Sequence, residues 1–142
     1  MKSILFLCTG NSCRSQMAHG LANEIFGDKI KSYSAGIESH GLNPAAVKVM
    51  SEIGIDISHH QSQTLDEFDS KTFDYVVAVC EHAASNCPTF PNQTNVIIKQ
   101  FDDPPKLAKL AKSDEEALRH YRIVRNQIRN WITTLPEQLS AS

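Results

Sequence analysis

The chain has 142 residues, a net charge of −2, a hydrophobic content of 41% and a charged content of 21%. These values are typical of one globular domain with its own core, so residues 1–142 are expected to form a single domain. The sequence has no long basic run and no apolar stretch of membrane length, which argues against nucleic acid or a membrane as a partner. No signal peptide is recognised, and four cysteines fit a reducing cytoplasm. We expect a cytoplasmic monomer.

Short apolar runs alternate with helix-like segments along the chain. This order predicts an α/β fold, a four-stranded parallel sheet with helices on both faces. The third predicted strand is almost continuously apolar, as expected of a strand that is buried on both faces. The strands are expected at residues 3–7, 31–35, 75–79 and 95–98.

Two later helices have recognisable ends. Asn43 and Pro44 are typical of an N-cap and a first helical position, and Gly54 suits a position past the helix end. Ser113 and Glu116 form a capping box that opens a long C-terminal helix. Apolar residues recur at helical spacing along that helix and predict its core face: Ala117, Tyr121, Val124, Ile128, Trp131 and Leu135.

The strongest chemical signal follows the first predicted strand. A cysteine, five residues and an arginine, Cys8 to Arg14, lead into a helix predicted over 15–26. Five successive backbone N–H groups can point at one tetrahedral anion, and Arg14 offers a planar fork to two of its oxygens. The same positive surroundings favour the thiolate of Cys8, so the segment predicts an oxyanion cradle with a nucleophile at its base. The intervening residues are Thr9, Gly10, Asn11, Ser12 and Cys13.

The motif from Cys8 to Ser15 resembles the signature of the low-molecular-weight protein tyrosine phosphatase fold. Gln16 stands where the phosphatases usually carry proline, and the segment 8–18 is more similar to the thioredoxin-coupled arsenate reductases of that fold. Segments 33–38, 40–44 and 101–104 continue the resemblance, which covers about the first three-quarters of the chain.

The resemblance implies a role for each of several residues. Cys8 is the nucleophile, and Cys80 and Cys87 carry the oxidation outward. Asp103, rather than its neighbour Asp102, protonates the departing oxygen. Composition alone allows a simpler reading of both aspartates, as turn formers before proline.

Cys80 directly follows the third predicted strand, and Cys87 comes seven residues later. A helix across 81–86 would separate the two by about 10 Å, whereas a disulfide needs Cα atoms within about 7 Å. Pairing would therefore unwind the segment, which makes it a candidate redox switch. Two alternatives remain open, a pair of buried inert cysteines and a metal site with His82. The spacing lacks the paired short intervals of a zinc signature.

Other polar residues near the cradle are expected to support it. Ser15 can cap the helix and donate a hydrogen bond to the Cys8 thiolate, and Asn11 can hold the loop shape. Cys13 is expected to be a packing residue. His59 and His60 are expected to form a solvated turn. No partner is apparent for the remaining histidines, His19, His40, His82 and His120.

The chain also departs from the reductase pattern. Some thioredoxin-coupled members bind potassium beside the cradle through carboxylates, an asparagine and a serine. Asn11 and Ser34 match the last two, but His19 and Gln63 stand where carboxylates are expected. Because hard cations prefer anionic oxygen ligands, we expect no metal site and no bound cofactor. The segment 105–112 has no tyrosine platform after Asp-Pro, which weakens a phosphotyrosine specificity.

These features together predict an arsenate reductase that converts arsenate to arsenite through three cysteines. Thioredoxin is the expected reductant, with glutathione and glutaredoxin as the alternative. Two rival functions remain: a phosphatase that uses Cys8, Arg14 and Asp103, which could also persist as a residual activity, and a non-enzymatic oxyanion or redox sensor. The combination of nucleophile, acid and cradle argues against the sensor.

Overall fold

A computed structural model describes residues 2–27, 29–68, 73–80 and 94–135. Four parallel strands form one sheet in the order β2-β1-β3-β4. Their bounds are Lys2–Cys8 for β1, Ile30–Gly36 for β2, Tyr75–Ala78 for β3 and Asn95–Ile98 for β4. The predicted fold class and all four strands are confirmed, and each strand end lies within one residue of the prediction.

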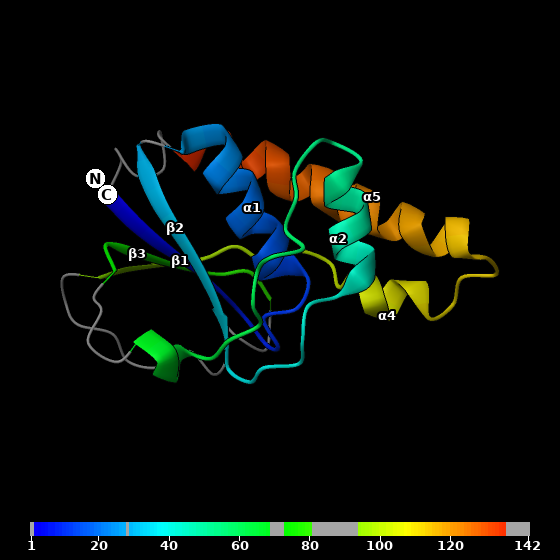
Figure 1. Cartoon of the computed structure of the whole chain (residues 1–142), viewed down its shortest axis with the longest axis horizontal. Helices are drawn as coiled ribbons and strands as arrows, with labels where there is room; N and C mark the ends of the chain where they lie inside the picture. The colour runs from blue at the N-terminus through cyan, green and yellow to red at the C-terminus, as the bar shows by residue number, and fades with distance from the viewer. Residues whose placement is uncertain (1, 28, 69–72, 81–93, 136–142) are drawn as a thin grey trace.

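Helices cover both faces of the sheet (Figure 1). The long helices α1 (Arg14–Phe26) and α5 (Asp114–Ile132) lie on one side with α2 (Pro44–Ser51), and the short η1 helix (Leu65–Phe68) lies on the other. Side chains alternate between the faces of a strand. Accordingly, Ser34 of β2 bonds to His19 of α1, whereas Tyr33 packs edge-on against Phe68 of η1.

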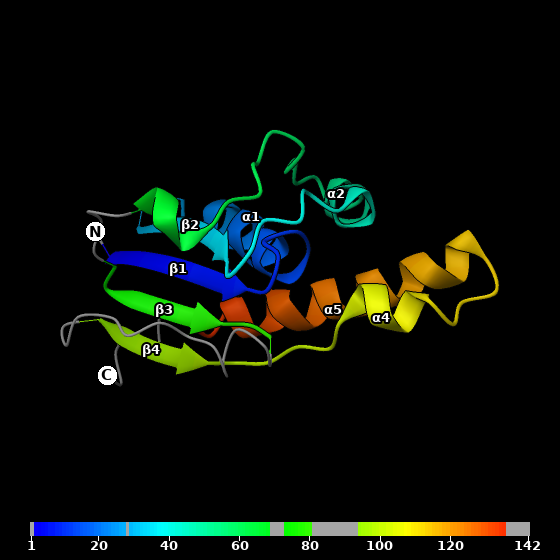
Figure 2. The ribbon, with the colours of Figure 1, turned by 90° about the horizontal axis from the view of Figure 1, so that it is seen from below.

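The order of the strands explains the sequence pattern of the core. β1 lies between β2 and β3, and its four central residues are fully buried, as a strand covered on both faces requires. All four strands point their carboxyl ends toward the same edge of the sheet, the edge nearest α4 (Pro104–Ala108) (Figure 2). Residues that follow different strands therefore meet there.

The helix ends follow the local chemistry that the sequence predicted. The Asn43 side chain accepts from Ala45 N at 2.8 Å and caps α2. Gly54, past the end of that helix, has φ +81°, a conformation that glycine adopts readily. Ser113 Oγ accepts from Glu116 N at 3.1 Å and caps α5. The apolar stripe along α5 is confirmed, with Tyr121, Val124 and Ile128 buried and Ala117 and Trp131 half-buried. The predicted last member of the stripe, Leu135, is also buried, but α5 ends before it, at Ile132.

The helix α4 was not predicted from the sequence. It starts at two prolines, packs against α5 and has Asp103 at its N-cap. Its short length left no periodic apolar pattern to detect. In the part of the chain that the structure describes, no helix is long and apolar enough to cross a membrane.

We expect Gly36→Ala to destabilise the protein, because the backbone of β2 lies close against the cradle at this residue. An added Cβ would lie 2.7 Å from Asn11 N and 2.8 Å from Thr9 O, and closer still to the Glu38 carbonyl. Backbone atoms cannot move aside cheaply, so the free energy of unfolding should fall by about 1–3 kcal/mol. Urea denaturation measures this. In the control Gly27→Ala the nearest atom would be 3.2 Å away; an equal loss in both variants would contradict the crowding argument.

Candidate active site

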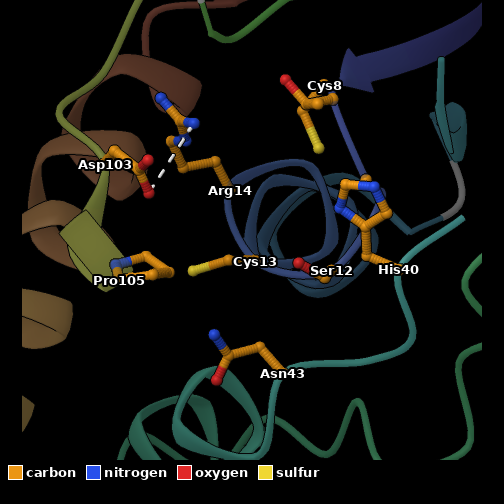
Figure 3. A pocket seen from close by; sticks show the side chains of 10 residues that line it. Cys8, Ser12, Cys13, Arg14, His40, Asn43, Asp103 and Pro105 are labelled. Atoms are coloured by element: carbon orange, nitrogen blue, oxygen red, sulfur yellow. Dashed lines mark ion pairs between the residues drawn. The ribbon is translucent and has the colours of Figure 1, made fainter. Parts of the chain in front are cut away.

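The loop that joins β1 to α1 forms the floor of a cavity of about 410 Å³ at the carboxyl edge of the sheet. In Figure 3 the Cys8 sulfur points into this cavity, with Arg14 and Asp103 on one side and His40 on the other. The cavity is lined by Cys8, Thr9, Gly10, Ser12, Cys13, Arg14, His40, Asn43, Asp103 and Pro105. The structure thus brings together the predicted nucleophile, arginine and acid.

The carbonyl groups of the cradle are turned away from the cavity by a second loop, residues 37–43. Four backbone N–H groups of this loop donate to four of the cradle carbonyls: Ile37 N to Cys8 O (3.1 Å), Glu38 N to Thr9 O (2.8 Å), His40 N to Gly10 O (2.9 Å) and Asn43 N to Ser12 O (2.9 Å). The Asn11 carbonyl accepts from Gln16 Nε2 instead, at 3.1 Å. In a trans peptide the N–H points opposite to the preceding C=O. The N–H groups that follow these four carbonyls, those of Thr9, Gly10, Asn11 and Cys13, are therefore directed inward, where they can hold an anion.

Arg14 and Asp103 form the charged wall of the cavity. One Arg14 nitrogen, Nη1, donates to the Phe101 carbonyl at 2.9 Å, and Nη2 lies 3.8 Å from Asp103 Oδ1. Asp103 is the N-cap residue of α4, yet its carboxylate makes no capping bond and lines the cavity instead. Asp102 lines neighbouring grooves but not this cavity. Asp103 is therefore the aspartate within reach of a bound oxyanion.

Ser15 lies beside the nucleophile. Its Oγ is 2.8 Å from Cys8 Sγ and accepts from Asn11 Nδ2 at 2.9 Å. Because Asn11 occupies one lone pair of the hydroxyl, the hydroxyl hydrogen is available to Cys8. The expectation that Ser15 caps the helix is wrong. Cys13 is the N-cap residue of α1, and Ser15 is fully buried in its first turn.

Asn11 and Gln16 fix the bend of the cradle. Asn11 has φ +49°, the left-handed conformation that is rare outside glycine. Its Oδ1 accepts from Gln63 N at 2.9 Å and from Gln16 Nε2 at 3.0 Å, so the predicted bond from its side chain to the backbone is confirmed. Gln16 also donates to the Gln61 carbonyl and is bonded to His60 Nδ1 at 2.9 Å. Sequence reasoning noted Gln16 only as a departure from proline and missed this network.

Histidines 19, 40 and 60 have partners that the sequence did not reveal. His19 Nδ1 lies 2.9 Å from Ser34 Oγ, and its ring stacks on that of His60 with centroids 4.5 Å apart. Burial, followed by the nearby His60, lowers the pKa of His19 from 6.5 to about 4. The expectation of a solvated turn holds for the exposed His59 but is wrong for the half-buried His60.

The four residues compared above with a potassium site, Asn11, His19, Ser34 and Gln63, lie together here. Gln63 Nε2 donates to the Ser34 carbonyl at 3.2 Å, next to the contacts of His19 and Asn11 already described. Amide, hydroxyl and imidazole groups provide no anionic oxygen at this point, so the residues present do not fit a hard cation. Among the described residues, no group of three His, Cys, Asp or Glu side chains could hold a metal ion.

Cys80 lies against the cradle. Its Sγ is 3.3 Å from Thr9 Oγ1, and the residue is buried at the end of β3. Cys13 is also buried, and burial, together with Cys8, raises the pKa of its thiol. Cys8 and Cys13 are both free thiols. The predicted partner Cys87, the metal-ligand candidate His82 and the switch segment 81–86 lie outside the described residues.

Comparison with known proteins agrees with this geometry. The family model for low molecular weight phosphotyrosine protein phosphatases matches residues 3–142. The chain belongs to this family. An arsenate reductase of Halalkalibacterium halodurans is 50% identical over 136 residues, and one of Bacillus subtilis is 47% identical over 136 residues. Both alignments cover 96% of each chain. A solved structure of an arsenate reductase in the oxidized state matches with a TM-score of 0.80 at 32% identity, covering 97% of this chain and 98% of the other.

We expect the stability of this family member to fall as the pH drops from about 6.5 to about 4, because of His19. The unfolded chain takes up a proton near pH 6.5, whereas the folded protein holds His19 neutral until about pH 4. The free energy of unfolding should lose up to about 3 kcal/mol over this range. His60, whose pKa is lowered by burial, acts in the same direction.

Urea denaturation at several pH values tests this expectation. His19→Asn should flatten the pH dependence, and the control His120→Asn, on α5 and outside this cluster, should leave it as in the wild type. If His19→Asn keeps the full loss of stability, His19 is not its source.

Proposed function

We propose that this chain is an arsenate reductase in which Cys8, Cys80 and Cys87 act in sequence and thioredoxin restores the thiols. Two relatives that match almost the whole chain at about 50% identity are arsenate reductases, which supports this substrate. The observation that supports the redox route is the position of Cys80. Its Sγ lies 3.3 Å from Oγ1 of Thr9, the residue that follows the nucleophile Cys8. A phosphatase on this fold would need only the nucleophile, the arginine and the acid.

In the proposed first step the cradle binds arsenate and the Cys8 thiolate attacks the arsenic atom. The inward N–H groups and Arg14 neutralise the negative charge of the oxygens. An arsenic–oxygen bond breaks as the sulfur–arsenic bond forms, and Asp103 supplies a proton so that the oxygen leaves as water. Ser15 stabilises the thiolate before the attack. The product is a covalent adduct in which arsenic is still pentavalent.

In the second step the Cys80 thiolate attacks the sulfur of Cys8. A disulfide forms between the two cysteines, and the electron pair of the sulfur–arsenic bond stays on arsenic. Arsenic is thereby reduced to the trivalent state and leaves as arsenite, while the two sulfurs lose two electrons in total. Phosphorus does not accept two electrons in this way, so a phosphate ester would end in hydrolysis instead.

In the third step Cys87 attacks Cys80 and releases Cys8 as a thiolate. The new disulfide links Cys80 and Cys87, and we propose that unwinding of 81–86 brings it to the surface. A dithiol of thioredoxin then takes over the oxidation by exchange, which closes the cycle with two electrons supplied per arsenite formed.

The assay that tests the function compares two substrates. With thioredoxin, thioredoxin reductase and NADPH, the protein should release many arsenite molecules per enzyme. Hydrolysis of an aryl phosphate should be slow in comparison. Efficient aryl phosphate hydrolysis without arsenite release would indicate a phosphatase, and the absence of both would favour a sensor.

Cys8→Ser should abolish arsenate reduction and any aryl phosphate hydrolysis, because a serine hydroxyl lacks a comparable anionic form near neutral pH. The loss should exceed about a thousandfold in either assay. Cys13→Ser, a change at another buried cysteine of the same loop, is the matched control and should retain turnover. Appreciable activity of Cys8→Ser would rule out Cys8 as the nucleophile.

Cys87→Ala should limit arsenite release to about one molecule per enzyme when thioredoxin is the sole reductant, because the first two steps need only Cys8 and Cys80. Residual aryl phosphate hydrolysis should survive. Cys80→Ala should instead stop before arsenite release. Multiple turnovers by Cys87→Ala would show that the relay does not pass through Cys87.

A further inference from the structure

We propose that His40, oriented by Glu38, is a substrate-binding residue that contacts the oxyanion from the side of the cavity opposite Arg14 and Asp103. The contact would serve any tetrahedral oxyanion in the cradle. Only the naming of arsenate as the substrate rests on the proposed function.

The first observation is that the half-exposed His40 side chain packs with its ring against the cradle. The His40 backbone N–H donates to the Gly10 carbonyl at 2.9 Å. A Cβ atom on Gly10 would lie 2.5 Å from Cγ of the ring and nearer still to Nδ1. The absence of a side chain at Gly10 therefore makes room for the imidazole, whose Nδ1 edge lies against the cradle backbone.

The second observation is that the outer edge of the ring is held. His40 Nε2 lies 2.6 Å from Glu38 Oε2, so Nε2 carries a hydrogen and donates it to the carboxylate. The orientation of the ring is then fixed, with Nδ1 on the cradle side. A doubly protonated ring would donate from Nδ1 toward the cavity as well.

The third observation is the distribution of charge around the cavity. Among its described lining residues, Arg14 and His40 are the two that can carry a positive charge. Figure 3 shows them on opposite sides of the Cys8 sulfur. Arg14 already donates to Phe101 O and lies near Asp103. A doubly negative anion bound between Arg14 and His40 would therefore find its second positive partner at His40. A hydrogen bond from a charged donor to an anion is among the strong ones.

Sulfate binding to the Cys8→Ser variant tests the proposed contact by binding alone, with no reaction at the nucleophile. Sulfate is tetrahedral and doubly negative, and the serine variant removes the reactive thiol. The other titratable or charged groups that contact the ring or line the same cavity are Glu38 from its own loop, Arg14 and Cys13 from the cradle and Asp103 from the start of α4. They are common to all His40 variants, so a comparison of these variants isolates the imidazole.

The measurement is the sulfate dissociation constant by calorimetry at pH 6. Relative to Cys8→Ser alone, Cys8→Ser/His40→Asn should bind sulfate about tenfold more weakly, because the anion loses its contact with the imidazole. Cys8→Ser/His40→Phe keeps a ring against Gly10 and should show the same loss. Glu38→Gln in the serine background should give a smaller loss, and His120→Asn should give none.

Several outcomes would overturn the proposal. Equal sulfate affinity of the His40→Asn and His40→Phe variants and their parent is the most direct of them. A loss in His40→Asn that His40→Phe restores would assign His40 a packing role only. Failure of the proposed function looks different: wild-type protein would release no arsenite while the sulfate data still follow the expectation for His40.

Discussion

The constraint on which the site depends is the set of hydrogen bonds between the loop 37–43 and the carbonyl groups of the cradle. A loop of five peptides can present its N–H groups to an anion only if its C=O groups are satisfied elsewhere. Residues 37–43 supply these partners from the chain segment that follows β2. The anion site therefore depends on the pairing of β1 with β2, because that pairing places the end of β2 beside Cys8.

Several other residues help to hold the cradle in this shape. Gly36 lets the two segments approach, and Asn11 accepts a left-handed bend that Gln16 and Gln63 stabilise from behind. A chain of hydrogen bonds runs from His60 through Gln16, Asn11 and Ser15 to Cys8. The thiol thus sits at the end of a buried polar network, in which removal of one member leaves the others unsatisfied.

Local patterns were sufficient to predict most of the fold and the centre of the site. Apolar runs located the strands, Asn43 and Ser113 marked helix starts, and the spacing of Cys8 and Arg14 indicated the cradle. Features that depend on distant segments were not readable. The partners of His19 and His60, the bond from Gln16 to the Gln61 carbonyl and the packing of α4 against α5 arise from contacts that no local pattern encodes. Ser15 illustrates the opposite error, since its local preference for capping is overridden by Cys8.

The central claim is that the backbone N–H groups of residues 9–13 hold a tetrahedral oxyanion. Amide NMR spectra of ¹⁵N-labelled protein during a phosphate titration test it most directly. The account predicts saturable shifts of the Thr9 to Cys13 amide resonances that follow one binding constant, with no such shifts on addition of chloride at equal ionic strength. Phosphate-dependent shifts that avoid these residues, or that chloride reproduces, would contradict it.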